Sequence, residues 1–409
     1  MNATPKSERL HIAIFGRRNA GKSSIINALT NQNVALVSDV AGTTTDPVYK
    51  AMELLPIGPV VFIDTAGIDD VGELGQMRVK KTYEVLNKTD LAVLVVDSST
   101  GIGDYEKELL NKIREKKVPV VGVINKTDLH NISDEVLKAW EKDLGINFVR
   151  VSAVSKSGIS NLKRAIVVNA PYDDTEMSIV GDLVRDGQIA VLVVPIDKAA
   201  PKGRLILPQQ QVIRDLLDHD AIAVVTKEHE LKRTLESLNQ KPALVITDSQ
   251  AFLKVDADTP KDIPMTSFSI LFARYKGDLN QLVAGAKAIE ALKPGDKVLI
   301  AEACTHHRQS DDIATVKIPR WLRQLVGGDL EFHWVSGGDF PDNLQEYRLI
   351  VHCGGCMINR REMMYRLSVA AEKGVPIVNY GVLIAYVMGV LDRALDPFPL
   401  ASMTFKGLI

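Results

Sequence analysis

The sequence has few cysteines, no excess of either charge and no long apolar run, and each shortage excludes a class of protein. Only 3 cysteines occur in 409 residues, which excludes a secreted fold built on disulfides. The 49 basic and 51 acidic side chains give a formal net charge of -2, which argues against a general electrostatic grip on nucleic acid. No apolar run reaches the ~18 residues of a membrane span, and the N-terminus has no secretory leader pattern. We therefore expect a cytoplasmic protein that binds neither membranes nor nucleic acid.

Hydrophobic residues are abundant, at 46%, and their arrangement indicates the fold class. Short Val/Ile/Leu runs alternate with helix-patterned polar stretches, which is typical of buried parallel strands joined by crossover helices. A chain of this length favours two or three domains. We predict an α/β protein with domains over 1–170, 176–265 and 270–409, joined at the first boundary by a polar linker near 170–175.

Strands are expected in all three segments, at 11–15, 60–64, 91–97, 118–125, 147–152, 189–196, 221–227, 243–248, 297–303, 330–335, 347–352 and 375–381. A buried helix is expected at 363–371. The central domain has no catalytic constellation, because we expect its two histidines, His219 and His229, on solvated helix faces. It is therefore predicted to serve assembly, most simply of a homodimer.

A phosphate-binding loop opens the chain. Residues 16–23 read GRRNAGKS and match G-x-x-x-x-G-K-S between a predicted strand and a predicted helix, as the motif requires. The loop amides and the helix N-terminus favour phosphate, with Lys22 reaching the β/γ-phosphates and Ser23 binding Mg²⁺. The nucleotide-binding residues expected here are Asn19, Ala20, Gly21, Lys22, Ser23 and Ser24.

Three further motifs, each at the end of a predicted strand, decide which nucleotide binds. The DTAG sequence at 64–67 supplies Asp64 on the Mg²⁺ side and a γ-phosphate backbone contact at Gly67. In the NKTD sequence at 125–128, a carboxylate accepts both N1–H and N2–H of guanine, a pairing that adenine does not offer. The amides of a following Ser-Ala pair suit the guanine O6. The base-binding residues expected are Asn125, Lys126, Asp128, Ser152 and Ala153, and the N-terminal domain is predicted to be a P-loop GTPase.

The order of these motifs resembles the translation-factor class of GTPases, and two details resemble Era and the tRNA-modification GTPases (MnmE) in particular. These are Asn19 and the GTTTD sequence at 42–46. The resemblance implies that Asn19 helps to bind an activating K⁺ and that Thr44 is the switch Mg²⁺ ligand. The relatives usually carry Arg at the position of Thr45. Ile68 stands where Ras-like proteins carry a water-orienting Gln, so we expect slow, K⁺-stimulated hydrolysis with Lys22, Thr44 and Gly67 as the catalytic groups.

All the cysteines lie near two predicted strand ends of the third domain. Cys304 and His306 follow one strand, and His352, Cys353 and Cys356 follow another. Both ends belong to the same predicted sheet, so the residues can converge at one crevice. Three thiolates suit a [4Fe–4S] cluster with one open iron, and Cys₃His also suits tetrahedral zinc. Spacing separates these metals poorly, and either histidine is a candidate fourth ligand.

A GTPase domain followed by C-x-H and H-C-G-G-C resembles the HydF family of [FeFe]-hydrogenase maturation GTPases over essentially the full length. The resemblance implies a scaffold that holds a [4Fe–4S] cluster through Cys304, Cys353 and Cys356. It also implies that the protein receives a di-iron precursor bearing CO and CN⁻, made with the radical-SAM partners HydE and HydG. That precursor is then delivered to the apo-hydrogenase HydA.

Two other functions compete with this one. The first is an Era/MnmE-type regulatory or RNA-processing GTPase with a structural zinc, although no G-x-x-G loop in a basic setting is evident. The second is a redox-sensing GTPase whose cluster controls nucleotide turnover. Loss of the cluster would change GTP hydrolysis only in the second.

Overall fold

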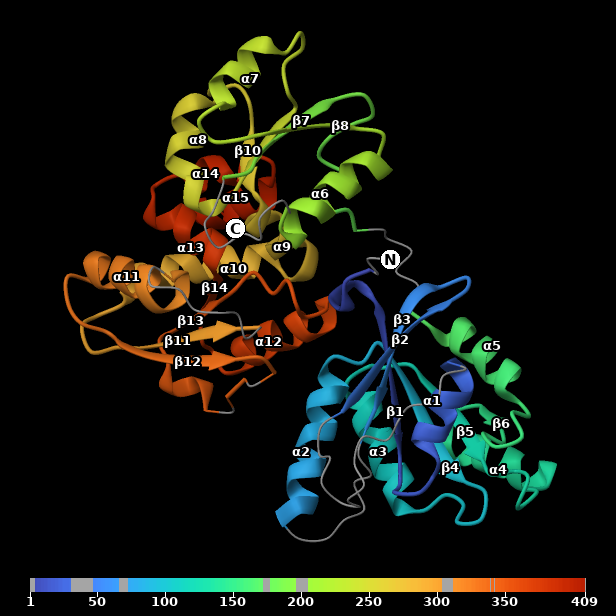
Figure 1. Ribbon diagram of the computed structural model, residues 1–409. Helices are drawn as coiled ribbons and strands as arrows, with labels where there is room; N and C mark the ends of the chain where they lie inside the picture. The colour runs from blue at the N-terminus through green and yellow to red at the C-terminus, as the bar shows by residue number, and fades with distance from the viewer. Residues whose placement is uncertain are drawn as a thin grey trace. The chain divides into compact units, whose positions relative to one another are not determined.

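The computed structural model describes residues 4–30, 47–65, 73–171, 177–195, 205–303, 312–338, 340–341 and 343–408, with the side chains of 73–78 left aside. The chain divides into two compact units, Met1–Asp174 and Thr175–Ile409. Both are α/β in Figure 1. Each unit is described by itself below.

The first unit is built on a six-stranded sheet in the order β2-β3-β1-β4-β5-β6. All neighbouring pairs are parallel except β2 and β3, which are antiparallel. The strands are β1 (Leu10–Gly16), β2 (Val48–Leu54), β3 (Gly58–Asp64), β4 (Leu91–Asp97), β5 (Val120–Asn125) and β6 (Phe148–Arg150).

Helices cover both faces of this sheet because its strands are apolar on both sides. In β1, Ile12 and Ile14 pack with α1 and α5, whereas Ala13 and Phe15 face the helices of the opposite layer. This alternation follows from the two-residue period of a strand, and it produces the doubly wound arrangement. The helices are α1 (Lys22–Thr30), α2 (Glu73–Asn87), α3 (Asp104–Glu115), α4 (Asp134–Leu144) and α5 (Ile159–Asn169).

The second unit contains two four-stranded parallel sheets, ordered β10-β9-β7-β8 and β12-β11-β13-β14. The first sheet has β7 (Ile189–Val193), β8 (Ile222–Thr226), β9 (Leu244–Thr247) and β10 (Met265–Ser267). The second has β11 (Lys297–Glu302), β12 (Glu331–Ser336), β13 (Leu349–His352) and β14 (Ile377–Asn379).

One hydrophobic core runs through both sheets of the second unit. Helix α9 (Phe268–Lys276) joins them, since it contacts α6, α10, α12, α13 and β10. Its N-terminus is capped by the Ser267 side chain, which accepts a hydrogen bond from the Ile270 amide at 3.2 Å. The remaining helices are α6 (Leu207–Asp218), α7 (Leu231–Ser237), α8 (Phe252–Asp258), α10 (Leu279–Lys287), α11 (Ile318–Val326), α12 (Arg360–Glu372), α13 (Tyr380–Val387), α14 (Leu391–Ala394) and α15 (Pro399–Lys406).

The structure confirms the predicted fold class, and every predicted strand range contains a strand. Two strands were not predicted. Strand β2 is a half-exposed antiparallel edge without a continuous apolar run, and β10 has only 3 residues. The predicted helix at 363–371 lies inside α12, and the predicted linker lies mostly outside the described residues.

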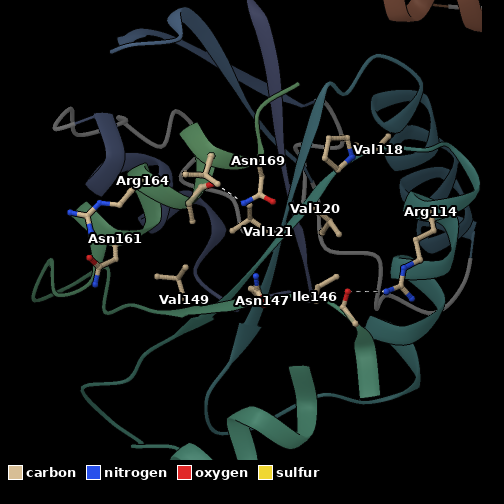
Figure 2. A pocket seen from close by; sticks show the side chains of 14 residues that line it. Arg114, Val118, Val120, Val121, Ile146, Asn147, Val149, Asn161, Arg164 and Asn169 are labelled. Atoms are coloured by element: carbon tan, nitrogen blue, oxygen red, sulfur yellow. Dashed lines mark hydrogen bonds between the residues drawn. The ribbon is translucent and has the colours of Figure 1, made fainter. Parts of the chain in front are cut away.

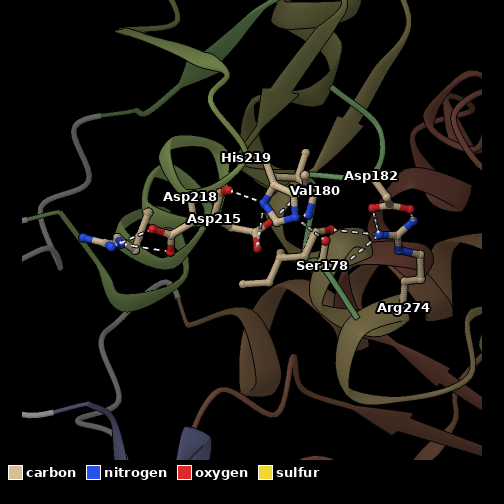
Figure 3. Close-up of polar contacts among 10 residues, drawn as sticks. Ser178, Val180, Asp182, Asp215, Asp218, His219 and Arg274 are labelled. Carbon is tan, nitrogen blue, oxygen red and sulfur yellow. Dashed lines mark hydrogen bonds and ion pairs between the residues drawn. The ribbon is translucent and has the colours of Figure 1, made fainter. Parts of the chain in front are cut away.

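His219 is less solvated than expected, with its side chain 34% exposed, whereas His229 is exposed as expected. His219 follows α6 and packs on Gly181. Its ring Nε2 lies 2.9 Å from Ser178 Oγ, and Nδ1 lies 2.7 Å from the Asp215 carbonyl (Figure 3). Because a carbonyl only accepts, Nδ1 carries a hydrogen, and in the neutral ring Nε2 then accepts from the serine. His219 therefore fastens the start of the second unit to α6.

None of the helices that the structure describes is both long and apolar enough to cross a bilayer.

Candidate functional site

The phosphate-binding loop lies between the carboxyl end of β1 and the start of α1, where an open α/β sheet binds its ligand. Gly21 has φ +88°, and a Cβ there would stand 2.2 Å from Asn125 Nδ2. Only glycine fits such a backbone this close to another motif. Lys22 is 7% exposed, and its Nζ donates to the carbonyls of Gly16 at 2.9 Å and Arg17 at 2.8 Å. The ammonium group thus already lies inside the loop that would surround the phosphates.

The Mg²⁺ side is formed by Ser23 at the start of α1 and Asp64 at the end of β3. The Ser23 hydroxyl donates a hydrogen bond to Asp64 Oδ2. Burial raises the pKa of Asp64, and the bond from Ser23 and the charge of Lys22 act in the opposite direction. A hydroxyl beside a carboxylate is a donor set that suits Mg²⁺, so these residues fit the ion that the motif implies.

Asn125 connects three of the predicted motifs. Its Nδ2 donates to the Ala20 carbonyl at 2.9 Å, and its Oδ1 accepts from the Ala153 amide at 3.2 Å. Both atoms are inside the protein, since Asn125 is 2% exposed. The side chain therefore holds the phosphate loop against the loop that follows β6.

The base side is more open. Lys126 Nζ lies 2.6 Å from Asp97 Oδ2, and Asp128 is exposed. Ser152 is 1% exposed, and its hydroxyl accepts from the Ser155 amide at 3.1 Å. An exposed carboxylate at the end of β5 is free to meet a base from solvent.

A further residue of the phosphate loop, Arg17, was missed by the sequence analysis. Its guanidinium makes two hydrogen bonds to Glu106 of α3, at 2.7 and 3.0 Å, and Glu106 is 1% exposed. The Glu106 Oε2 also accepts from the Gly103 amide at 2.8 Å. This paired arrangement is strong and directional, so it ties the phosphate loop to the start of α3.

Two of the predicted catalytic groups, Thr44 and Gly67, lie outside the described residues, as do Thr45 and Ile68. Asn19 is described: it is exposed and has φ +62°. That left-handed conformation is uncommon outside glycine, although asparagine tolerates it better than most residues.

The pocket in Figure 2 is distinct from the nucleotide site. It has a volume of about 620 Å³ and is lined by Val120 at the start of β5, Asn147 just before β6, and Asn169 at the end of α5. Strand starts and strand ends lie at opposite edges of a parallel sheet. The pocket is therefore at the edge away from the phosphate loop.

The second predicted site is at the carboxyl ends of β11 and β13, which are paired so that Ala301 stands opposite His352. The Cys353 sulfur accepts hydrogen bonds from the amides of Ala303 at 3.1 Å and Gly355 at 3.4 Å. Burial raises the pKa of the Cys353 thiol, and these two bonds act in the opposite direction. Amide-to-sulfur bonds of this kind accompany iron–sulfur ligation, so the thiol fits a cluster ligand.

The backbone of the turn between the two described cysteines favours glycine at position 355. Gly355 has φ +64°, and a Cβ there would lie 2.5 Å from Met363 Cε. Cys353 and Cys356 are both partly exposed on this turn. Cys304 and His306 lie outside the described residues, and within the described ranges no three His, Cys, Asp or Glu side chains gather as a metal site.

His352 has both ring nitrogens in hydrogen bonds. It is 0% exposed, its Nδ1 lies 2.7 Å from the Cys353 carbonyl, and its Nε2 lies 3.1 Å from Arg366 Nη1. Burial, and then the Arg366 charge, lower the pKa of His352 to about 3. The ring is therefore neutral, with the hydrogen on Nδ1, and it would have to leave Arg366 to bind a metal through Nε2.

Two buried cations beside the cysteine turn were also missed, Lys276 of α9 and Arg366 of α12, each 1% exposed. Arg366 lies within the stretch that was predicted as a buried helix. A charged residue in such a stretch is the one signal that would have found it, because charges are rarely buried without a purpose.

Comparison with known families gives three matches that together span most of the chain. The model of the hydrogen maturase F dimerization domain matches residues 179–277, and that of the hydrogen maturase F tetramerization domain matches 280–397. These two ranges make up more than half of the chain. A GTPase family, described as a 50S ribosome-binding GTPase, matches residues 11–126.

Curated relatives resemble the GTPase domain. The tRNA modification GTPase MnmE of Chromobacterium violaceum is 34% identical over 170 residues, which is 41% of this chain and 36% of that protein. MnmE of Thermoanaerobacter sp. is 39% identical over 161 residues, which is 39% of this chain and 34% of that protein. The match thus spans about a third of the length of these relatives. The solved structure of Aquifex aeolicus Era matches 60% of this chain and 97% of its own, at 19% identity and a TM-score of 0.36.

Proposed function

The chain belongs to the hydrogen maturase F family, and we propose that it is the GTP-hydrolysing scaffold on which a cluster precursor is held for [FeFe]-hydrogenase. The observation that carries the proposal is that the Cys353 sulfur accepts a hydrogen bond from the Ala303 backbone amide, at the end of the neighbouring strand. Ala303 directly precedes Cys304 in the sequence. The residue that precedes Cys304 therefore lies at the same sheet edge as Cys353.

We propose that Cys304, Cys353 and Cys356 hold a [4Fe–4S] cluster and leave one iron exchangeable. Such a cluster supplies a coordination position that a cargo can occupy and leave. His306 is the histidine that we assign as a fourth ligand, because His352 is held by Arg366 and by the Cys353 carbonyl. His352 takes that role only if Arg366 releases it.

The GTPase domain acts as the switch. Lys22 lies within the phosphate loop, where it would contact the phosphates. Ser23 and Asp64 supply the Mg²⁺ side, and Asp128 supplies the guanine contact. We propose that Thr44 and Gly67 complete the site when the γ-phosphate is present, and that Asn19 contributes to an activating K⁺ site. Hydrolysis then changes contacts with partners rather than supplying bond-making chemistry.

The cargo is a di-iron unit bearing CO and CN⁻, received from the radical-SAM proteins HydE and HydG and delivered to apo-HydA. The family match supports the hydrogenase-maturation context. The MnmE similarity, which stays at the GTPase domain, gives no comparable support to RNA processing. A maturase that releases its cargo needs weak ligation at one position and strong ligation elsewhere, and three thiolates meet that need.

We propose that the scaffold works as an oligomer and that two chains pair through the edge strand β8. This strand ends its sheet, and Ile222 and Val225 on it are 47% and 46% exposed. Leu217, near the end of the adjacent α6, is 56% exposed. Unpaired edge groups beside apolar side chains favour pairing with a second chain, in keeping with the dimerization model that matches this region.

The experiment that tests the proposal is anaerobic reconstitution with iron and sulfide, followed by dithionite reduction and low-temperature EPR. We expect a [4Fe–4S]⁺ signal that changes when imidazole or cyanide is added, since an exchangeable iron accepts either. One tightly bound zinc per chain, with no cluster, would instead favour the GTPase with a structural metal.

A second experiment tests the switch. Binding of HydE and HydG is compared between the GDP form and a form with a non-hydrolysable GTP analogue. We expect the two forms to differ in affinity for at least one partner. Equal affinities for both partners would contradict a switching role for the nucleotide.

A further inference from the structure

A buried lysine lies against the cysteine turn. Lys276, the last residue of α9, is 1% exposed, and its Nζ donates to the carbonyls of Gly355 at 3.4 Å, Cys356 at 3.3 Å and Ile358 at 3.0 Å. An ammonium group has three hydrogens to donate. Three acceptors from one short loop therefore converge on a single side chain that is 79 or more positions away in the sequence.

These contacts fix which way the peptide groups of the turn face. The peptide bonds here are trans, and in a trans peptide the carbonyl and the following N–H point in opposite directions. Because the carbonyls of Gly355 and Cys356 face Lys276, the N–H groups of Cys356 and Met357 face away from it. The Gly355 N–H, one residue earlier, donates to the Cys353 sulfur at 3.4 Å.

The backbone on either side of this lysine is held by the neighbouring helix α12. Arg360 of α12 donates from Nη1 to the carbonyls of Tyr275 at 2.6 Å and Gly277 at 3.3 Å, on either side of Lys276. The Lys276 ammonium also stands 5.8 Å from the centre of the Phe272 ring, a cation–π distance. Its position is thus set by α9 and α12, and it does not depend on a metal.

Among the described residues, two helices and one strand end carry charged groups close to the cysteine edge, the strand residue being Glu302 at the end of β11, which is 3% exposed. Lys276 belongs to α9, and Arg366 and Glu362 belong to α12, where they pair at 2.8 Å. Adding an electron to a cluster adds negative charge, so a nearby cation stabilises the reduced form and raises the reduction potential. N–H donors to sulfur act in the same direction.

We propose that Lys276 is a positioning residue of the metal site. It holds the turn from Cys353 to Ile358 in the conformation in which two thiols face a common ligand, and its charge raises the reduction potential of a bound cluster. The second half of this inference rests on the proposed function, whereas the first half concerns the metal-free protein as well.

The test compares the variants Lys276→Met and Lys276→Arg in the full chain, with Lys232→Met on the exposed face of α7 as the matched control. Amide hydrogen exchange is followed in the metal-free proteins over the peptide that contains residues 354–358. We expect exchange in Lys276→Met to be faster on the order of tenfold, because a lost hydrogen bond to a charged group shifts local opening by about that factor. Lys276→Arg should show a smaller change, and the control none.

The same proteins are then reconstituted anaerobically. For Lys276→Met we expect a more negative midpoint potential in an EPR titration and faster loss of iron to a chelator, and for Lys276→Arg a potential near that of the unaltered protein. The proposal would be overturned if a folded Lys276→Met protein showed both unchanged amide hydrogen exchange and an unchanged midpoint potential. If that variant does not fold, Lys276→Gln, which retains an N–H donor without the charge, must keep exchange near normal and still lower the potential.

The two proposals fail in different ways. If the unaltered protein takes up no cluster, the scaffold function and the effect on potential are lost, but hydrogen exchange still decides whether Lys276 holds the turn. If the cluster forms and Lys276→Met behaves as the control in both measurements, the scaffold function stands and the role of Lys276 is rejected.

Discussion

The nucleotide edge of the first unit and the cysteine edge of the second occupy the same place in an α/β sheet, yet they are supported differently. At the first, the motifs hold one another: Asn125 bridges Ala20 and Ala153. At the second, the cysteine turn is held from outside by Lys276, and the adjoining His352 by Arg366; both cations are fully buried. The nucleotide edge also has a buried cation, Lys22 at 7% exposed, but that lysine belongs to the phosphate loop itself.

This difference predicts which substitutions affect each site. At the nucleotide edge, each functional residue belongs to a short sequence motif at the end of a strand. A single substitution in such a motif is therefore expected to change nucleotide affinity or the rate of GTP hydrolysis. Support for the cysteine edge comes from helix α9, whose Lys276 is 79 or more positions from the turn, and from helix α12, which begins at Arg360 shortly after Cys356. Changes in those helices are expected to alter the proposed metal site while leaving the GTPase domain intact.

The largest expected effect is at the cysteines. Cys353→Ser should abolish stable cluster assembly, because a serine hydroxyl is a poor ligand for iron that thiolates hold strongly. Cys356→Ser should do the same. Iron and sulfide content after reconstitution measures the loss, and titration with a fluorescent GDP analogue provides the control, since nucleotide affinity should be unaltered. Full iron content in both variants would refute the ligand assignment.

At the nucleotide edge, the sharpest test is Asp128→Asn. The carboxylate that accepts two N–H groups of guanine is replaced by an amide, and we expect GTP affinity to fall on the order of 100-fold, the value of one or two charged hydrogen bonds. Xanthosine triphosphate carries a carbonyl where guanine has its amino group, so it should bind the variant better than GTP does. Calorimetry with GTP and with xanthosine triphosphate measures this change of preference. An unchanged preference for GTP would show that Asp128 does not contact the base.

An intermediate effect is expected at the β8 edge. Val225→Lys places a charge where a second chain is proposed to pair, and we expect self-association to weaken on the order of tenfold or more, because an unpaired charge in an apolar interface is costly. Sedimentation velocity over a concentration series measures it. Leu253→Lys on α8, at a site that is 58% exposed, is the matched control. Equal association of both variants would place the interface elsewhere.

The smallest effect is expected at Asn19. In Asn19→Ala, GTP hydrolysis should lose most of its stimulation by K⁺ over Na⁺, while nucleotide affinity changes little because the residue is exposed and lies outside the Lys22 contacts. Steady-state hydrolysis in the two salts gives the ratio directly. A ratio equal to that of the unaltered protein would leave Asn19 as a turn residue only, in keeping with its φ of +62°.

Much of the fold was predictable because buried parallel strands are continuous apolar runs. The ends of β1, β3 and β5 carry motifs whose residue types are dictated by phosphate, Mg²⁺ and guanine. Strand β2 escaped prediction because it is half-exposed and has no such run. His219 escaped because the residue that satisfies it, Ser178, lies 41 positions away.

The sequence by itself determined the α/β class, the nucleotide chemistry and the gathering of thiols near two strand ends, since each depends on residues that are adjacent in the chain. Only the tertiary structure decided that Asn125 ties the phosphate loop to the loop after β6, that Arg366 hydrogen-bonds to His352, and that the Lys276 ammonium supports the cysteine turn. The partners are 14 positions apart for His352 and Arg366, 28 and 105 for the two contacts of Asn125, and 79 or more for Lys276 and the turn, and their contacts form only once packing has removed water from both partners.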